Sequence, residues 1–366
     1  MRFACHKETL VGAFETVAKV CPASAVTHSD LNVQMEVRDG TLRLATENHQ
    51  LSASTSMPVD EGENGSVAIV GRLGMDILRG VLTSRQDRVE VSTQGLRAVV
   101  TSADARYDVS GYEVFGSVVT SVTDPLKRFD VPTALLTEAL RQVLPVAGGE
   151  STTYAEVHLD CVAGELSIVA TDSVRLAMWA RKVEGVEIPD FTALVPSHSL
   201  AELLPMLRGQ ATVGVSLSEE HVGFTLGPTE IRARLSDKTF PNFRTILPKT
   251  QATSASIRTQ ELIDNLKGVL PLAKDTKNKV FFDFRDDRIV VSSMSPEFGE
   301  ARREVECVLD GPGRLLAFNA KYVLDFLATC GTPNFTWGFT KETYPSTMRP
   351  SGDSGFVTIL MPLTHV

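Results

Sequence analysis

The sequence predicts an α+β protein made of three copies of one module, each with two helices packed on antiparallel sheets. Three features of the chain support this prediction. A helical pattern of apolar residues recurs every 126 residues, pairs of alternating strands follow each copy of it, and a second short helix stands inside each copy. A chain of 366 residues is also longer than a domain with a single hydrophobic core usually is.

The first helix of each copy carries apolar residues at positions i, i+4 and i+7, which share one helical face. In the first copy these are Leu10, Phe14 and Val17. The other two copies repeat the spacing at Leu136, Leu140 and Val143, and at Leu262, Leu266 and Val269. We therefore expect three helices that each bury one face against strands.

A hairpin follows each of these helices. Alternating apolar residues cross a turn at Asp39 and Gly40 in the first copy, at Gly164 in the second, and at Asp286 and Asp287 in the third. Alternation on both sides of a short turn is typical of two antiparallel strands.

A second helix and a further pair of strands complete each copy. The second helices are predicted near residues 72–81, 197–207 and 320–330, and strand pairs follow, as at 87–102 and 211–227. Turn-forming and polar residues then interrupt the pattern, which places the module boundaries at 1–127, 128–251 and 252–366. Units of this length are too long for a solenoid and indicate a pseudo-symmetric assembly.

The composition is that of a globular protein and restricts the possible partners. The net charge of −9 argues against a large basic face that binds nucleic acid tightly. No apolar run reaches membrane-spanning length and the first residues lack the apolar core of a signal peptide, so we expect a cytoplasmic protein without a membrane partner. The five scattered cysteines indicate reduced structural thiols, with no metal site.

The stretch VATDSVRLAMW, residues 169–179, ends an apolar strand with polar residues and an arginine. From the residues alone it has three interpretations. Asp172 and Arg175 form a catalytic carboxylate and its cationic partner, or they form a corner between two strands, or they form one wall of a binding pocket.

Four stretches resemble the beta sliding clamp of the bacterial replicative DNA polymerase III, and the resemblance covers essentially the whole chain. They are ATDSVRLA, TFPNFRTILPK, FNAKYVLDFL and the terminal ILMPL, in that order. The resemblance implies a head-to-tail homodimer that closes into a ring, with helices inside and continuous sheets outside. It implies a processivity factor that encircles duplex DNA, with no catalytic activity and no cofactor.

The geometry of such a ring agrees with the acidic composition. Twelve helices about 9 Å apart enclose a bore of roughly 25 Å, which a duplex roughly 20 Å wide passes without being gripped. A topological link needs few phosphate contacts, and tight ones would impede sliding. The cations expected to face DNA are Lys19, Arg79, Arg141, Arg208 and Lys267.

The resemblance also implies a pocket for short peptides between the second and third modules. Its partners would be the polymerase III catalytic subunit, the clamp loader, repair polymerases and ligase. In this interpretation Arg175 donates hydrogen bonds and stacks, and Asp172 braces the corner. The implied pocket residues are Tyr154, Thr171, Ser173, Val174, Arg175, Leu176, Pro241, Ile246, Asn319, Tyr322, Met361, Pro362 and Leu363.

The chain departs from the family pattern in this region. Ser173 and Val174 replace a common Gly-His pair, Thr245 replaces a second arginine, and VTHSDLNV stands where LPILxNI is usual. These departures predict a more apolar pocket and leave partner preference open.

A dimer seam between the first and third modules is implied as well. Leu272 is expected against Val109 or Tyr107, and one ion pair has the reverse of the usual polarity, with Asp104 facing Arg303. The other expected ion-pair positions are Arg97 and Arg106, opposite Glu297 and Glu300.

Two other functions remain as alternatives. The first is a monomeric three-domain scaffold that binds peptides without closing a ring. The second is a hydrolase that uses Asp172 or Ser354, because SGDSGF at 351–356 resembles a serine protease motif. Only ten residues follow Phe356 and no histidine stands in a matching context, so a turn is the better interpretation.

Overall fold

The computed structural model describes residues 1–21, 31–83, 85–114, 116–149, 152–353 and 355–364. The chain divides into two compact units, residues 1–134 with 199–235 and residues 135–198 with 236–366. Among the described residues, no helix has the length and apolar character needed to cross a membrane.

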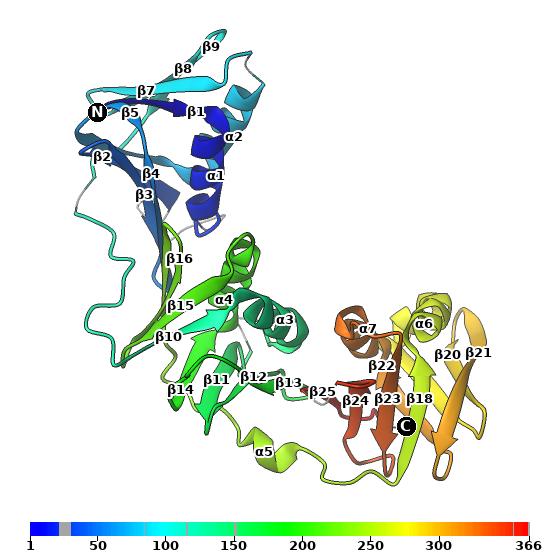
Figure 1. Cartoon of the computed structure of the whole chain (residues 1–366). Coiled ribbons are helices and arrows are strands. Elements are labelled where there is room, and N and C mark those ends of the chain that lie inside the picture. The colour runs from blue at the N-terminus through cyan, green and yellow to red at the C-terminus, as the bar shows by residue number, and fades with distance from the viewer. Residues whose placement is uncertain (22–30, 84, 115, 150–151, 354, 365–366) are drawn as a thin grey trace. The chain divides into compact units, whose positions relative to one another are not determined.

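The first unit contains the whole amino-terminal repeat. Helices α1 and α2 lie side by side, and Figure 1 shows them next to the strands of this repeat. The elements are β1 (Arg2–His6), α1 (Lys7–Ala18), β2 (Asn32–Arg38), β3 (Thr41–Glu47), β4 (Leu51–Pro58), β5 (Asp60–Glu63), β6 (Gly65–Val70), α2 (Gly71–Leu82), β7 (Arg88–Gln94), β8 (Arg97–Ser102) and β9 (Ala105–Ser110).

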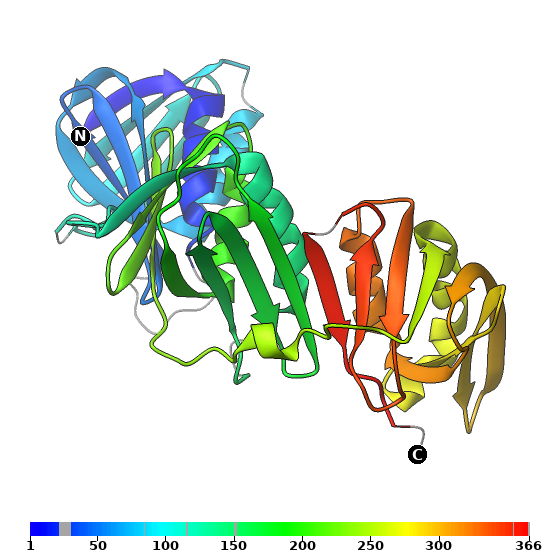
Figure 2. The same ribbon diagram turned by 60° about the horizontal axis from the view of Figure 1, so that its bottom comes forward.

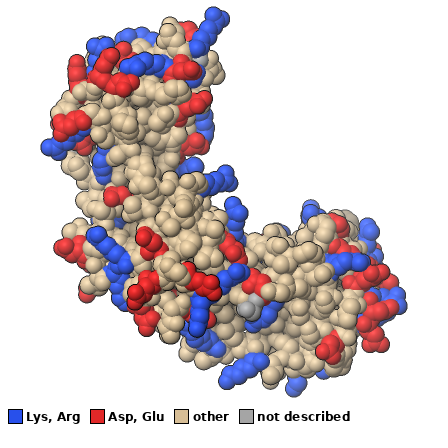
Figure 3. All heavy atoms as spheres, viewed as in Figure 1, with Lys and Arg blue, Asp and Glu red and all other residues tan. Residues whose placement is uncertain are grey.

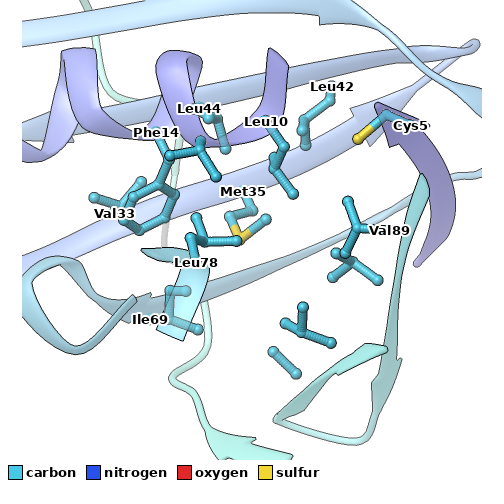
Figure 4. Packing of buried hydrophobic residues seen from close by; sticks show 14 of the residues in the cluster. Cys5, Leu10, Phe14, Val33, Met35, Leu42, Leu44, Ile69, Leu78 and Val89 are labelled. Atoms are coloured by element: carbon cyan, nitrogen blue, oxygen red, sulfur yellow. The ribbon is translucent and has the colours of Figure 1, made fainter. Parts of the chain in front are cut away.

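The core of this repeat confirms the predicted helix face. Leu10, Phe14 and Val17 are fully buried, and apolar side chains from β2, β3, β6 and α2 surround them (Figure 4). The predicted hairpin also forms, with Asp39 and Gly40 both at positive φ in the turn between β2 and β3. Such a turn matches the twist of the strands it joins.

Gly74 sets how closely α1 and α2 approach, and it gives a stability prediction. A Cβ atom at this position would lie 2.5 Å from Cζ of the buried Phe14 and 3.0 Å from Cδ1 of Ile69. For Gly74→Ala we expect the free energy of unfolding to fall by about 1 to 2 kcal/mol, because the overpacking outweighs the better helix propensity of alanine. Urea denaturation followed by circular dichroism measures this change.

Gly12 is a matched control, because it lies on α1 and a Cβ atom there would meet nothing within 4 Å. Gly12→Ala is therefore expected to stabilise the protein slightly. If the Gly74 variant proved as stable as the Gly12 variant, the inference that α1 and α2 are too close at Gly74 to admit a methyl group would be wrong.

The first unit also holds half of the middle repeat. Its strands are β10 (Lys127–Pro132), β15 (Thr212–Leu217), β16 (His221–Leu226) and β17 (Thr229–Arg234). β17 pairs with β4, so one eight-stranded sheet runs β10-β15-β16-β17-β4-β3-β2-β6 and continues from the first repeat into the second. A five-stranded sheet, β5-β1-β7-β8-β9, completes this unit.

Helices α3 (Thr133–Val143) and α4 (Ser197–Leu203) are those predicted for the middle repeat. Leu136, Leu140 and Val143 are buried as expected. The second helix was predicted to reach residue 207, but α4 ends at Leu203 and residues 204–207 form a 3₁₀ turn. Pro205 explains this difference, since it has no N–H to continue the α-helical ladder.

The second unit is built on a twelve-stranded sheet that runs β14-β11-β12-β13-β25-β24-β23-β18-β21-β20-β19-β22. Strand β13 of the middle repeat pairs with β25 of the last, so this sheet also crosses a repeat junction. The middle-repeat strands are β11 (Glu156–Val162), β12 (Glu165–Thr171), β13 (Arg175–Lys182) and β14 (Phe191–Pro196), and the short helix α5 (Phe243–Ile246) follows in the connecting segment.

The last repeat places its two helices side by side on one face of its strands (Figure 1). Strands β23, β24 and β25 (orange to red) can be followed in Figure 2. The elements are β18 (Thr253–Arg258), α6 (Thr259–Ala273), β19 (Lys279–Phe284), β20 (Arg288–Ser295), β21 (Gly299–Asp310), β22 (Leu315–Asn319), α7 (Ala320–Thr329), β23 (Asn334–Phe339), β24 (Ser346–Pro350) and β25 (Phe356–Leu360). The chain thus carries three modules of paired helices on antiparallel sheets, as predicted; the exact module boundaries stay a prediction.

The cysteines are all unbridged, in agreement with the sequence. Cys5 and Cys307 are buried, and burial raises the pKa of Cys5 to about 12 and that of Cys307 to about 11. Thiols with such pKa values stay protonated near neutral pH and are poor nucleophiles.

Candidate functional site

The stretch between β12 and β13 is a tight corner held by its own polar side chains. Asp172 Oδ1 accepts hydrogen bonds from the amides of Val174 (3.0 Å) and Arg175 (2.9 Å). The hydroxyl of Thr171 donates to the carbonyl of Arg175 at 2.7 Å. Ser173 stands at φ 79°, a left-handed conformation in which glycine is the least strained residue. The corner interpretation of Asp172 is therefore correct: its carboxylate braces the turn.

Arg175 is buried at this corner and joins the middle and last modules. Its Nε donates to Asp172 Oδ2 (2.9 Å), its Nη1 to Asp325 Oδ2 (2.6 Å), and its Nη2 to the carbonyl of Pro145 (2.7 Å). The guanidinium also lies 4.1 Å from the centre of the Tyr322 ring. The predicted roles in hydrogen bonding and stacking are both present, and all three guanidinium nitrogens are occupied.

Exposed apolar side chains gather around this arginine from both modules. The amide of Met361 donates to the carbonyl of Val174 at 3.1 Å, and the amide of Leu363 to the carbonyl of Ala317 at 2.7 Å. Val174 and Met361 keep 38% and 40% of their surface exposed. Exposed apolar groups held beside the paired strands β13 and β25 are suited to receive an apolar ligand.

A small buried cluster lies beneath this surface. Leu176 is 2% exposed and packs with Val169, Phe243 and Ile359. Phe243 belongs to α5, so the connecting segment is anchored on the sheet formed by β12, β13 and β25. The segment carries the predicted residues Pro241 and Ile246, of which Ile246 is 42% exposed.

The remaining predicted residues lie at the edges of this region. Asn319 caps α7, where its Oδ1 accepts from the amide of Lys321 at 3.0 Å. Tyr154 meets the ring of Phe240 edge-on, with centroids 6.4 Å apart. Pro362 lies between Met361 and Leu363 and is half-buried.

Sequence reasoning missed two groups that hold the site together. Asp325 is the partner of Arg175, and the signal for it was its position one helical turn after Tyr322 on α7. Phe243 belongs to the underlying cluster and Phe240 packs against it, but only the fold brings them onto β12 and β13.

The five cations predicted to face DNA are all exposed on or beside the helices. Arg79 lies 3.8 Å from Asp76 on the same helix. The other four, Lys19, Arg141, Arg208 and Lys267, have no carboxylate within 4 Å in the described part of the chain. Of the acidic residues on the helices, Glu138 on α3 is paired with Arg181, and Asp325 on α7 is paired with Arg175.

The residues predicted for the dimer seam lie on β8, β9, α6 and β21 and in the turns that precede β9 and β21. Tyr107 and Val109 point inwards from β9, and Val109 is only 5% exposed, whereas Arg106 and Asp108 point outwards. Arg97 already pairs with Asp108 within the module at 3.3 Å. Leu272 is half-buried, and Asp104, Glu297, Glu300 and Arg303 are exposed.

Charged side chains of both signs gather over β20 and β21 (Figure 3). The ion pairs there include Arg288 with Glu304 at 3.2 Å and Arg302 with Glu304 at 3.6 Å. This end of the last module therefore presents both signs of charge at its surface.

Three family models match successive parts of the chain. They describe the N-terminal, central and C-terminal domains of the DNA polymerase III beta subunit and match residues 1–114, 130–242 and 244–364. The beta sliding clamps of Streptomyces coelicolor and Bacillus subtilis are 26% and 24% identical, and each comparison covers 99% of both chains.

Solved structures show the same fold. The DNA polymerase III beta subunit of Thermotoga maritima matches with a TM-score of 0.93 at 22% identity and covers 100% of both chains. A sliding clamp of Pseudomonas aeruginosa bound to griselimycin matches with a TM-score of 0.92 at 20% identity, over 100% of this chain and 99% of the other.

Proposed function

Because the chain belongs to the DNA polymerase III beta subunit family, we propose that it is a DNA sliding clamp that encircles duplex DNA as a ring of two chains. It tethers the replicative polymerase and other partners for processive synthesis and has no catalytic activity of its own. Its place of action is the cytoplasm.

The observation that carries this proposal is the repeat of one module three times with its sheets joined. β17 pairs with β4 and β13 pairs with β25, so the sheet continues across both junctions within a chain. Among the described strands, β9 pairs only with β8, and residues 299–306 of β21 pair only with β20. These two free edges are suited to join one chain to the next, head to tail.

The hold on DNA is mechanical in this proposal. A protein of net charge −9 with a few exposed cations on its helices attracts phosphate weakly and does not grip it. Lys19, Arg79, Arg141, Arg208 and Lys267 supply that attraction.

Partner peptides bind the surface around Arg175 in this proposal. The exposed Val174, Ile246 and Met361 receive leucine and aromatic side chains, and the Arg175 network keeps the two modules at a fixed spacing. The griselimycin-bound relative supports a ligand site on this fold, and we expect griselimycin to bind here. Partners of this kind are the polymerase III catalytic subunit, the clamp loader, repair polymerases and ligase.

Sedimentation at micromolar concentration tests the ring against a monomeric scaffold. We expect a mass twice the 39.7 kDa of one chain. The single variants Asp104→Arg and Arg303→Asp are expected to weaken the dimer, because each places like charges across the seam, and the double variant to restore it. Arg38→Asp, an exposed change on β2, is the matched control and should leave the dimer intact.

A single-chain mass for the wild type at these concentrations would favour the monomeric scaffold. If the double variant stayed as weakly dimeric as the single variants, the proposed contact between Asp104 and Arg303 would be rejected. Dimerisation of the wild type would not be contradicted.

A further inference from the structure

Three side chains on one face of β11 fasten the connecting segment that precedes β18. Glu156, His158 and Asp160 alternate along the strand, so they point to the same side. Glu156 Oε1 lies 2.8 Å from Lys238 Nζ. The ring of His158 stacks on Phe240, with centroids 5.1 Å apart and planes 19° apart.

The third contact joins Asp160 to Arg244. Arg244 Nη2 donates to Asp160 Oδ2 at 2.9 Å, and His158 Nε2 lies 3.5 Å from the same oxygen. We call Glu156, His158 and Asp160 the β11 ladder. The contacts follow one another along both partners, so the segment lies along the strand; it is yellow-green in Figure 2.

The carboxylates of the ladder are buried while their cationic partners are half exposed. The side chains of Glu156 and Asp160 are 8% and 4% exposed, against 50% for Lys238 and for Arg244. Burial alone would raise the pKa of Asp160, but hydrogen bonds from His158 and Arg244 outweigh it and lower that pKa. Asp160 Oδ1 accepts no hydrogen bond from the described residues, so the charge depends on the two groups at Oδ2.

The segment depends on the ladder for its position. Helix α5 has four residues, which is too short to be stable alone. Phe243 enters the buried cluster under the candidate surface, and the Arg244 guanidinium lies 4.5 Å from its ring centre. Pro241 and Ile246 flank this anchor, so the contacts that hold Phe240 and Arg244 also fix where these two residues stand.

We propose that Glu156, His158 and Asp160 are positioning residues of the peptide-binding surface. They hold α5 and its flanks in the binding arrangement before a ligand arrives, so they set affinity without belonging to the predicted contact residues. A segment that is already ordered loses less conformational entropy when the ligand binds, so the affinity is higher. This inference rests on the proposed function of the surface around Arg175.

The test measures griselimycin affinity and amide hydrogen exchange on the full chain. Asp160→Asn and Arg244→Gln are each expected to weaken binding roughly tenfold, and the double variant to be no weaker than the worse single one, because both remove the same contact. Exchange at residues 240–247 should rise in all three variants before ligand is added, while α6 stays protected. Arg244→Lys should restore part of the affinity.

Two control variants separate this inference from the proposed function. Arg285→Gln removes a 2.6 Å ion pair with Asp283 in the last module. It should change neither the affinity for griselimycin nor the hydrogen exchange at residues 240–247. Val174→Asp alters the surface itself and should abolish binding. If the wild type does not bind, or Val174→Asp binds as well as the wild type, the proposed site falls and this inference falls with it.

The inference alone is overturned if Val174→Asp abolishes binding while Asp160→Asn and Arg244→Gln bind normally. It is also overturned if these variants bind weakly with no rise in exchange at 240–247, or with exchange raised equally throughout β11 to β14, because the effect would then be general loss of structure.

Discussion

Replacing Arg175 with alanine is expected to abolish most of the peptide binding and to destabilise the protein at the same time. The change removes the guanidinium donor from the carbonyl of Pro145 and from the Oδ2 atoms of Asp172 and Asp325, and it uncovers the ring of Tyr322. Breaking a buried ion pair by removing one partner costs about 3 kcal/mol at the lower end of the measured range. We use the lower end because the side chain of Asp325 is 39% exposed.

The effect on binding follows from the position of Arg175 between two modules. Its contacts hold β13 beside α7, and the exposed residues of the candidate surface stand on both sides of it. We expect affinity for griselimycin, or for a labelled peptide with leucine and phenylalanine anchors, to fall roughly a hundredfold, in the range of a hot-spot residue. Isothermal titration calorimetry measures the affinity, and urea denaturation measures the stability.

Arg258 provides the matched control for this change. It also contacts two carboxylates, those of Glu261 at 2.6 Å and Glu306 at 2.8 Å, but it is 60% exposed. Surface ion pairs contribute about 0 to 1 kcal/mol, so Arg258→Ala should affect stability little and binding not at all. Equal losses in the two variants would show that Arg175 has no special role.

Much of the fold could be predicted because its signals are local. The apolar spacing at Leu10, Phe14 and Val17 specifies a helix and the face it buries, and the Asp39–Gly40 turn specifies a hairpin. The end of α4 was harder to predict, because the apolar pattern continues past Leu203 and Pro205 alters the hydrogen bonding within it.

The contacts that hold the site were less predictable because their partners are far apart in the sequence. Arg175 meets Asp325 across 150 residues, and Asp160 meets Arg244 across 84. No local pattern links such pairs. The corner residues Thr171 and Asp172 were easier, because their hydrogen bonds stay within four residues.

The residues of the predicted dimer seam were also difficult to assign from the sequence. The family resemblance implied that Leu272 contacts Val109 or Tyr107 of a partner chain. On β9, however, the alternation of side chains turns Val109 and Tyr107 inwards and Arg106 outwards. Which residues of β9 meet the next chain stays a prediction, and the charge-reversal variants test the neighbouring pair, Asp104 with Arg303.

We expect this protein to hold DNA by enclosing it. The most direct measurement loads it onto nicked circular DNA with its clamp loader and ATP, isolates the complex, and follows retention in high salt before and after one restriction cut. We predict that the protein stays on the intact circle in high salt and leaves once the circle is cut, because only the free ends of a linear molecule release a closed ring. Binding through phosphate contacts weakens steeply with salt whether or not the DNA has ends. Equal, salt-dependent loss from circular and linear DNA would therefore contradict the account.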